Sequence, residues 1–233
     1  MKRIGLALGG GGAKGFAHIP VLEVFDELDI RPRHIAGTSM GAIIGALYAS
    51  GHKAADIRSM LDPLMAPQKS SMKTLFRSKD LLGFLQLIDP EFSLKPKGLI
   101  KGDKLLGFLY QQLQVNTFHE LRIPLKVIAA DFWRKEQVVF DSGELLPALR
   151  ASMALPYLFT PVEKDGRVLV DGGLVNNVPH DQLSPNCDIR IAVDVMGSKS
   201  ESMTKIPSPR DAVFHTYNVM INAMTREKLI NHP

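Results

Sequence analysis

The chain places a serine on a turn whose spacing suits acyl transfer. Ser39 lies in Gly37-Thr38-Ser39-Met40-Gly41, which fits the pattern G-x-S-x-G between a predicted strand and a predicted helix. A serine on such a sharp turn exposes its hydroxyl, and small neighbours permit the tight backbone. The helix N-terminus behind it favours developing negative charge. Because this pentapeptide also occurs in ordinary turns, it indicates a nucleophile only together with other groups.

A glycine-rich segment precedes the serine by one predicted helix. Residues 10–15 read GGGAKG and fit G-x-G-x-x-G directly after a predicted strand. The same pattern is typical of dinucleotide sites, which need an acidic residue near the end of the second strand to hold the ribose. That position holds Gly37-Thr38-Ser39 instead, so nucleotide binding stays only an alternative interpretation.

The two segments follow successive strands, which we expect to lie side by side. A right-handed crossover makes such strands parallel neighbours about 4.8 Å apart, with both loops at the same edge of the sheet. The glycines Gly10, Gly11 and Gly12 are therefore the predicted oxyanion hole beside Ser39. Removing one donor of this kind typically costs about 3–4 kcal/mol of barrier stabilisation.

Asp171 is the best-placed base for the serine. It follows the predicted strand 167–170, so its carboxylate emerges at a strand end, and Gly172 and Gly173 leave room for another group. The simpler interpretation is an Asp-Gly turn. In α/β-hydrolases the order is Ser, Asp or Glu, then His. Among the seven histidines, His215 fits that order, but its helical surroundings argue against such a role.

Taken together, these segments resemble the motifs of patatin-like phospholipases. The segments at 10–15, 37–41 and 171–173 occur in the family's order, and ASMALP at 151–156 resembles a fourth family segment. The resemblance implies a Ser-Asp dyad without histidine, in which Ser39 forms an acyl-enzyme and Asp171 takes its proton and later activates water. It also implies a glycine-loop oxyanion hole, lipid or other acyl-ester substrates, no metal and no other cofactor.

Other motif residues are expected to support this site. Lys14 matches the basic position of the glycine segment, and we expect it to order the loop, with an anionic head group as the alternative partner. Pro20 and His180 depart from the family pattern: Pro20 questions the regularity of the first helix, and His180 is a candidate to line the site. The small residues Gly15, Gly37, Gly41, Gly172 and Gly173 complete the supporting set.

The elements that must position these residues alternate between strand and helix. Strands are predicted near residues 2–8, 34–37, 125–130, 137–140, 167–170 and 189–195, and helices near 16–28, 39–50, 103–113, 145–154 and 209–230. This alternation predicts an α/β fold with a largely parallel sheet. The family resemblance refines it to three layers, with helices flanking the central sheet. We expect residues 1–233 to form one patatin-like domain, because no linker divides the chain.

Composition and charge indicate which classes of binding partner to expect. The 233 residues carry a net charge of +4, which is below a nucleic-acid-binding profile, and the one cysteine excludes an internal disulfide. No apolar run is long enough for a membrane span, so we expect a cytoplasmic protein, peripheral to a membrane at most. Basic and bulky apolar residues mix between Gln68 and Lys104. We therefore predict a mobile cover at 66–102 that touches lipid, with an ordinary insertion as the alternative.

The same sequence leaves two further functions open. The first is a small-molecule carboxylesterase with a narrow pocket, and the second is a non-catalytic nucleotide-binding or scaffold protein on the same fold. A serine-reactive probe separates the second from any hydrolase, because only an activated nucleophile reacts with it.

Overall fold

A mixed seven-stranded sheet forms the centre of the molecule. The computed structural model describes residues 2–65, 107, 109, 111–156, 158–197 and 206–231. The strands are β1 (Ile4–Leu8), β2 (His34–Thr38), β3 (Leu125–Asp131), β4 (Glu136–Phe140), β5 (Val162–Lys164), β6 (Arg167–Asp171) and β7 (Ile189–Val193). Their order is β5-β6-β3-β2-β1-β7, with β4 paired to β3. Strands β7, β1, β2 and β3 are parallel neighbours, which confirms the largely parallel α/β fold.

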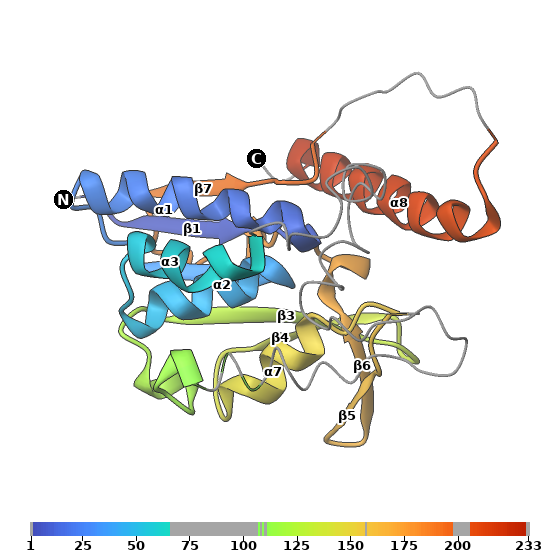
Figure 1. Cartoon of the computed structure of the whole chain (residues 1–233), viewed down its shortest axis with the longest axis horizontal. Coiled ribbons are helices and arrows are strands. Elements are labelled where there is room, and N and C mark those ends of the chain that lie inside the picture. The colour runs from blue at the N-terminus through green and yellow to red at the C-terminus, as the bar shows by residue number, and fades with distance from the viewer. Residues whose placement is uncertain are drawn as a thin grey trace.

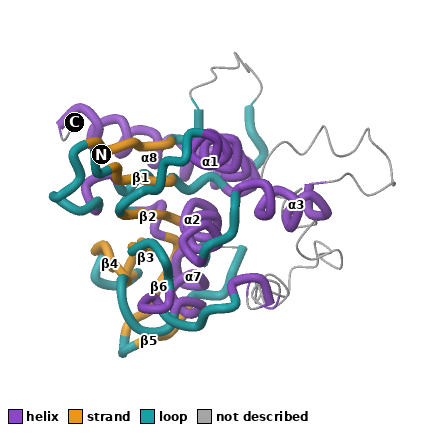
Figure 2. Tube along the Cα trace, turned by 90° about the vertical axis from the view of Figure 1, so that its left-hand side faces the viewer, coloured by secondary structure: helices purple, strands orange, loops and turns teal. Residues whose placement is uncertain are grey.

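Helices lie on both sides of this sheet. They are α1 (His18–Glu27), α2 (Met40–Ser50), α3 (Ala54–Met65), α7 (Leu145–Ser152) and α8 (Pro209–Asn231). Figure 1 shows the strands running across the molecule, and Figure 2 shows α1, α2 and α3 on one side of the sheet and α8 on the other. Short 3-10 helices cover Gly12–Ala17, Phe118–Glu120, Gly172–Leu174 and His180–Gln182 (η1 to η4). Among the described residues, no helix is long and apolar enough to cross a membrane.

Strand β3 brings β2 and β6 end to end. Its residues 127 and 128 pair with both β2 and β4, whereas residues 129–131 pair with both β4 and β6. Because a strand has only two edges, β2 and β6 must share the edge opposite β4. Thr38, the last residue of β2, pairs with Ile128, and Asp171, the last residue of β6, pairs with Ala129. The two strand ends therefore meet beside β3.

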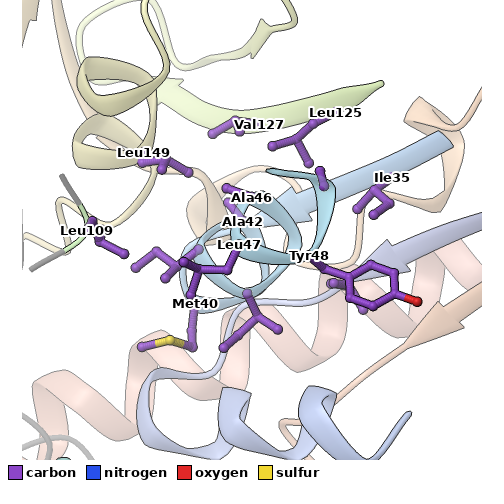
Figure 3. Packing of buried hydrophobic residues seen from close by; sticks show 14 of the residues in the cluster. Ile35, Met40, Ala42, Ala46, Leu47, Tyr48, Leu109, Leu125, Val127 and Leu149 are labelled. Carbon is purple, nitrogen blue, oxygen red and sulfur yellow. The ribbon is translucent and has the colours of Figure 1, made fainter. Parts of the chain in front are cut away.

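Helix α2 forms the centre of the hydrophobic core. Ten of its eleven residues are buried, and Figure 3 shows its side chains packed against β2, β3 and α7. A helix that is apolar all round has to be enclosed in this way. Gly41 allows close packing, since a Cβ there would overlap the carbonyl of Leu8. The helix ends at Gly51, whose φ of 112° is the left-handed conformation that glycine adopts most easily.

The remaining sequence predictions have mixed outcomes. The first helix is preceded by the 3-10 helix η1, and Pro20 lies in the first turn of α1, where its missing N–H costs little. Thr117 and Glu120 form a capping box at the start of the short 3-10 helix η2. Helix α3 was not predicted from the sequence; it buries Ala54, Ile57 and Leu61 at helical spacing. The predicted cover at 66–102 lies outside the described residues.

Candidate active site

Ser39 occupies a strained turn between β2 and α2. Its backbone has φ 52° and ψ −122°, a conformation rare for residues other than glycine. Small neighbours make this turn possible: a Cβ at Gly37 would lie 2.6 Å from the Ala42 Cα. Strain of this kind persists only where the surroundings fix it, and it presents the side chain beyond the sheet edge. The serine is partly exposed, in contrast to the buried Thr38 and Met40 beside it.

The serine hydroxyl is hydrogen-bonded to the predicted base. Ser39 Oγ donates to Asp171 Oδ2 at 2.8 Å, across a sequence separation of 132 residues. The other carboxylate oxygen, Oδ1, accepts the N–H of Gly173 at 2.7 Å. Asp171 is buried, so both oxygens are held in fixed positions. The structure thus brings the two residues singled out from the sequence into direct contact.

Burial makes this carboxylate more basic than an ordinary one. Desolvation raises the pKa of Asp171 from 3.8 to about 6, while the hydrogen bonds from Gly173 and Ser39 oppose the change. Burial disfavours the charged form of a carboxyl group, and donated hydrogen bonds favour it. An aspartate with a pKa near 6 is ionised at neutral pH and still a better proton acceptor than an exposed one.

A second serine fixes the backbone of the turn. Ser39 N–H donates to Ser152 Oγ at 2.8 Å, and Ser152 Oγ donates to the Ile128 carbonyl at 2.5 Å. Ser152 is the last residue of α7 and is fully buried. It therefore links α7, β3 and the nucleophile turn through one hydroxyl. The fourth family segment contains this serine, but its motif alone did not reveal what the hydroxyl contacts.

Asn177 anchors the glycine loop beside Ser39, and Asn176 anchors the turn that carries Ser39. Gly10 N–H donates to the Asn177 carbonyl, and Asn177 Nδ2 donates to the Gly10 carbonyl, each at 3.1 Å. Thr38 Oγ1 donates to the carbonyl of the preceding Asn176 at 2.8 Å. The loop and the nucleophile turn are thus both tied to the segment that follows Asp171. The roles of Asn176 and Asn177 could not be predicted from the sequence, because they depend on backbone atoms distant in the chain.

The glycine loop lies against the nucleophile without room for side chains. A Cβ at Gly10 would lie 3.2 Å from the Ser39 Cβ and 2.7 Å from Asn177 Oδ1. Gly12 has a φ of 54°, again a left-handed conformation. Gly15 packs on Met40 so closely that a Cβ there would overlap that side chain. The loop is therefore adjacent to Ser39, as its position after β1 predicted.

The other predicted site residues serve the framework. Lys14 Nζ donates to the Met196 carbonyl at 3.2 Å, which agrees with an ordering role for the loop. Gly172 passes close to β3, where a Cβ would overlap the Ile128 carbonyl. His180 is buried, and its Nδ1 lies 3.1 Å from the Val178 carbonyl. The sequence analysis did not single out His18, whose Nε2 donates to the Gly9 carbonyl at 2.7 Å and whose pKa is lowered by burial.

Helix α8 contributes a tyrosine next to the dyad. A Cβ placed on Gly173 would lie 2.9 Å from the Tyr217 hydroxyl and 3.0 Å from Asp171 Oδ1, so these two groups face the same small volume. Burial, together with the nearby Asp171 charge, raises the pKa of Tyr217 well above its usual value. The sequence analysis placed residue 217 in a helix but could not bring that helix to the site. Among the described residues, no cluster of three metal-ligating side chains occurs.

The chain is similar in sequence to known proteins. The family model of patatin-like phospholipase matches residues 6–184. An uncharacterized NTE family protein of Mycobacterium bovis is 34% identical over 200 residues, covering 85% of this chain and 50% of that protein. The human patatin-like phospholipase domain-containing protein 6 is 30% identical over 205 residues, covering 85% of this chain and 14% of that protein.

Solved structures give a more distant likeness. VipD from Legionella pneumophila aligns with a TM-score of 0.47 and 18% identity, over 79% of this chain and 48% of that chain. The chain spans about half the length of the mycobacterial relative and a smaller share of the human one. Since the family model covers most of the sequence, including Ser39 and Asp171, the chain belongs to the patatin-like phospholipase family.

Proposed function

We propose that the chain is a serine acyl hydrolase acting on lipid esters through Ser39 and Asp171. The observation that carries this proposal is the 2.8 Å hydrogen bond from Ser39 Oγ to Asp171 Oδ2, on a turn that presents the serine at the sheet edge. Membership of the patatin-like phospholipase family supports the lipid substrate class. A hydroxyl held against a buried carboxylate is a nucleophile with its base in place.

The proposed reaction passes through an acyl-enzyme. Ser39 Oγ attacks the ester carbonyl carbon as Asp171 Oδ2 accepts the hydroxyl proton. The tetrahedral intermediate collapses, the C–O bond to the alcohol breaks, and Asp171 returns the proton to the leaving alkoxide. Asp171 then takes a proton from a water molecule that attacks the acyl-enzyme, and Ser39 leaves with that proton. Atoms and charge balance over the cycle, and histidine is not required.

The glycine loop is the proposed oxyanion hole. The N–H groups of Gly10 and Ser39 already donate to Asn177 and Ser152, respectively. The N–H groups of Gly11 and Gly12 are therefore the proposed donors to the oxyanion. These residues open the 3-10 helix η1, where the first amides point away from the helix without a carbonyl partner inside it. The N-terminus of α2 adds partial positive charge behind Ser39. Gly10 then acts as the spacer that lets the loop approach the nucleophile.

A fluorophosphonate probe tests the proposal directly. Wild-type protein should be labelled at Ser39 and should hydrolyse soluble esters and phospholipid. Ser39→Ala should abolish labelling and turnover. Asp171→Asn should lose most turnover, because the amide cannot take the serine proton. His215→Ala is the matched control, and it should label and turn over as wild type does.

Each alternative has its own outcome. Labelling and soluble-ester turnover without phospholipid turnover would favour the small-molecule carboxylesterase. Absence of labelling together with absence of any ester hydrolysis by the folded wild type would overturn the enzyme proposal in favour of a non-catalytic role. Loss of labelling in His215→Ala would contradict the histidine-free dyad.

A further inference from the structure

The turn between β3 and β4 presents two aromatic side chains to solvent. Phe132 and Trp133 are 46% and 74% exposed, and Trp133 is the sole tryptophan of the chain. Their rings contact each other edge to face, with centroids 4.9 Å apart and planes at 84°. Exposed large apolar residues elsewhere in the described part of the chain do not form such an aromatic pair. Such a pair leaves a large apolar area in water.

A buried carboxylate holds this turn in one shape. Asp131 is 2% exposed, and its Oδ1 accepts the N–H of Trp133 at 3.1 Å and of Arg134 at 3.0 Å. Phe132 N–H donates to the Val168 carbonyl at 2.8 Å, and Lys135 N–H donates to the Asp131 carbonyl at 2.9 Å. Hydrogen bonds to Asp131 of β3 and Val168 of β6 therefore fix the backbone of the turn. The two rings cannot fold back into the core without breaking these bonds.

The turn lies on the same edge of the sheet as the dyad. Strands β2 and β3 are parallel, so Ser39 after β2 and Phe132 after β3 emerge at the same side. Asp131 lies two residues beyond Ala129, the partner of Asp171, which is roughly 7 Å along the strand. The aromatic turn thus projects beyond Ser39 along the direction of β3.

The charges around the turn are nearly balanced, with a small positive excess. Arg134 and Arg167 face Asp131 and Glu136, and Lys135 in the turn adds one further positive charge. The ion pairs among them are long, between 3.7 and 3.9 Å. Amphipathic aromatic rings with adjacent cations suit the head-group region of a bilayer, where tryptophan is favoured. The rings should supply most of the binding, with a modest preference for anionic lipid.

We infer that Phe132 and Trp133 insert into the surface of a phospholipid bilayer and bring Ser39 to its substrate. This inference rests on the proposed function for its purpose, but the contact itself can be measured without turnover. The residues of the turn form a surface anchor, defined here as Phe132 to Lys135. In the sequence, this segment does not overlap residues 66–102.

The sole tryptophan makes the test direct. In the Ser39→Ala background, which leaves the lipid intact, Trp133 emission is recorded as vesicles of phosphatidylcholine with phosphatidylglycerol are added. We expect a blue shift, and quenching when the acyl chains carry bromine. Cosedimentation with the same vesicles should be roughly tenfold weaker for Phe132→Ser/Trp133→Ser, because two interfacial rings are lost. Leu28→Ser is the matched control: it removes another exposed apolar side chain, at the C-terminal end of α1, and should sediment as the parent does.

Activity separates this inference from the proposed function. With Ser39 restored, Phe132→Ser/Trp133→Ser should hydrolyse a monomeric short-chain ester at the wild-type rate and vesicle phospholipid several-fold more slowly. An unchanged Trp133 spectrum in the presence of vesicles, or equal sedimentation of the double variant and its parent, would overturn the anchor. Vesicle binding through Trp133 without any ester hydrolysis would keep the anchor and overturn the proposed function.

Discussion

Asp171 sets the pH range in which the proposed dyad works. Only the ionised carboxylate can accept the Ser39 proton, and burial raises its pKa to about 6. We therefore expect kcat/KM for a soluble ester to fall about tenfold per pH unit below 6 and to level off above it. A pH–rate profile with a stable, monomeric ester measures this. A limb near pH 7 that disappears on replacing His18 or His180 would contradict a dyad without histidine.

The burial of Asp171 should also lower the stability of the folded protein at neutral pH. Between pH 3.8 and about pH 6, Asp171 keeps its proton in the folded protein but releases it in the unfolded chain. The free energy of unfolding therefore falls as the pH rises through this window. The difference between the two pKa values of Asp171 corresponds to a loss of about 3 kcal/mol in the free energy of unfolding. Asp171→Asn removes the ionisation and should unfold at higher urea concentration than wild type at pH 8, while the two converge below pH 4. Urea denaturation at both pH values tests this, and a less stable Asp171→Asn at pH 8 would contradict it.

At the scale of elements, the sequence predicted the pairing of Ser39 with Asp171 but not the contacts that hold the two residues in place. Ser39 and Asp171 each stand at a strand end with glycines nearby, a pattern local enough to recognise. The register that makes β2 and β6 meet end to end depends on how β3 pairs with two strands that are distant from it in the sequence. The contacts of Ser152 and Asn177 are to backbone atoms of other elements, and a single sequence does not encode those in a local pattern.

Helix α7 should control the nucleophile turn through Ser152. Ser152→Ala removes the acceptor of the Ser39 amide and the donor to the Ile128 carbonyl, so both backbone groups lose this partner. Each such group costs about 1–3 kcal/mol. We expect a lower midpoint of thermal unfolding and slower fluorophosphonate labelling of Ser39. Ser50→Ala, which removes only a local bond within α2, is the control and should label at the wild-type rate. Labelling of Ser152→Ala at that same rate would show that the turn is held without it.

At the scale of the whole molecule, the C-terminal helix closes the site from outside the matched family region. The family model ends at residue 184, whereas α8 begins at Pro209 and still places Tyr217 beside Asp171. The sequence predicted a helix near residues 209–230 but not the direction in which it packs. Only the folded chain shows that α8 lies across η3 and η4, on the side of the sheet opposite α1 and α2 (Figure 2).

The contacts that hold α8 in place should influence the pKa of Asp171. Lys228 Nζ lies 2.6 Å from Asp181 Oδ1, and that carboxylate also accepts from Asn176, so the ion pair ties α8 to the segment that holds the site. Burial raises the pKa of Asp181. Hydrogen bonds from Lys228, Asn176 and Gln182 outweigh this effect of burial, so the pKa is lowered overall. Lys228→Met should loosen α8, admit water beside Tyr217 and reduce the desolvation of Asp171.

The pKa of Asp171 should then move from about 6 toward 3.8, and the acidic limb of the pH–rate profile should move to lower pH in the same direction. Arg226→Met removes an exposed charge from the same helix and serves as the control, with the wild-type midpoint expected. Tyr217→Ala should shift the limb in the same sense as Lys228→Met, because it opens the same volume. If neither variant moves the midpoint while both remain folded, the desolvation of Asp171 arises from β3 and the glycine loop alone.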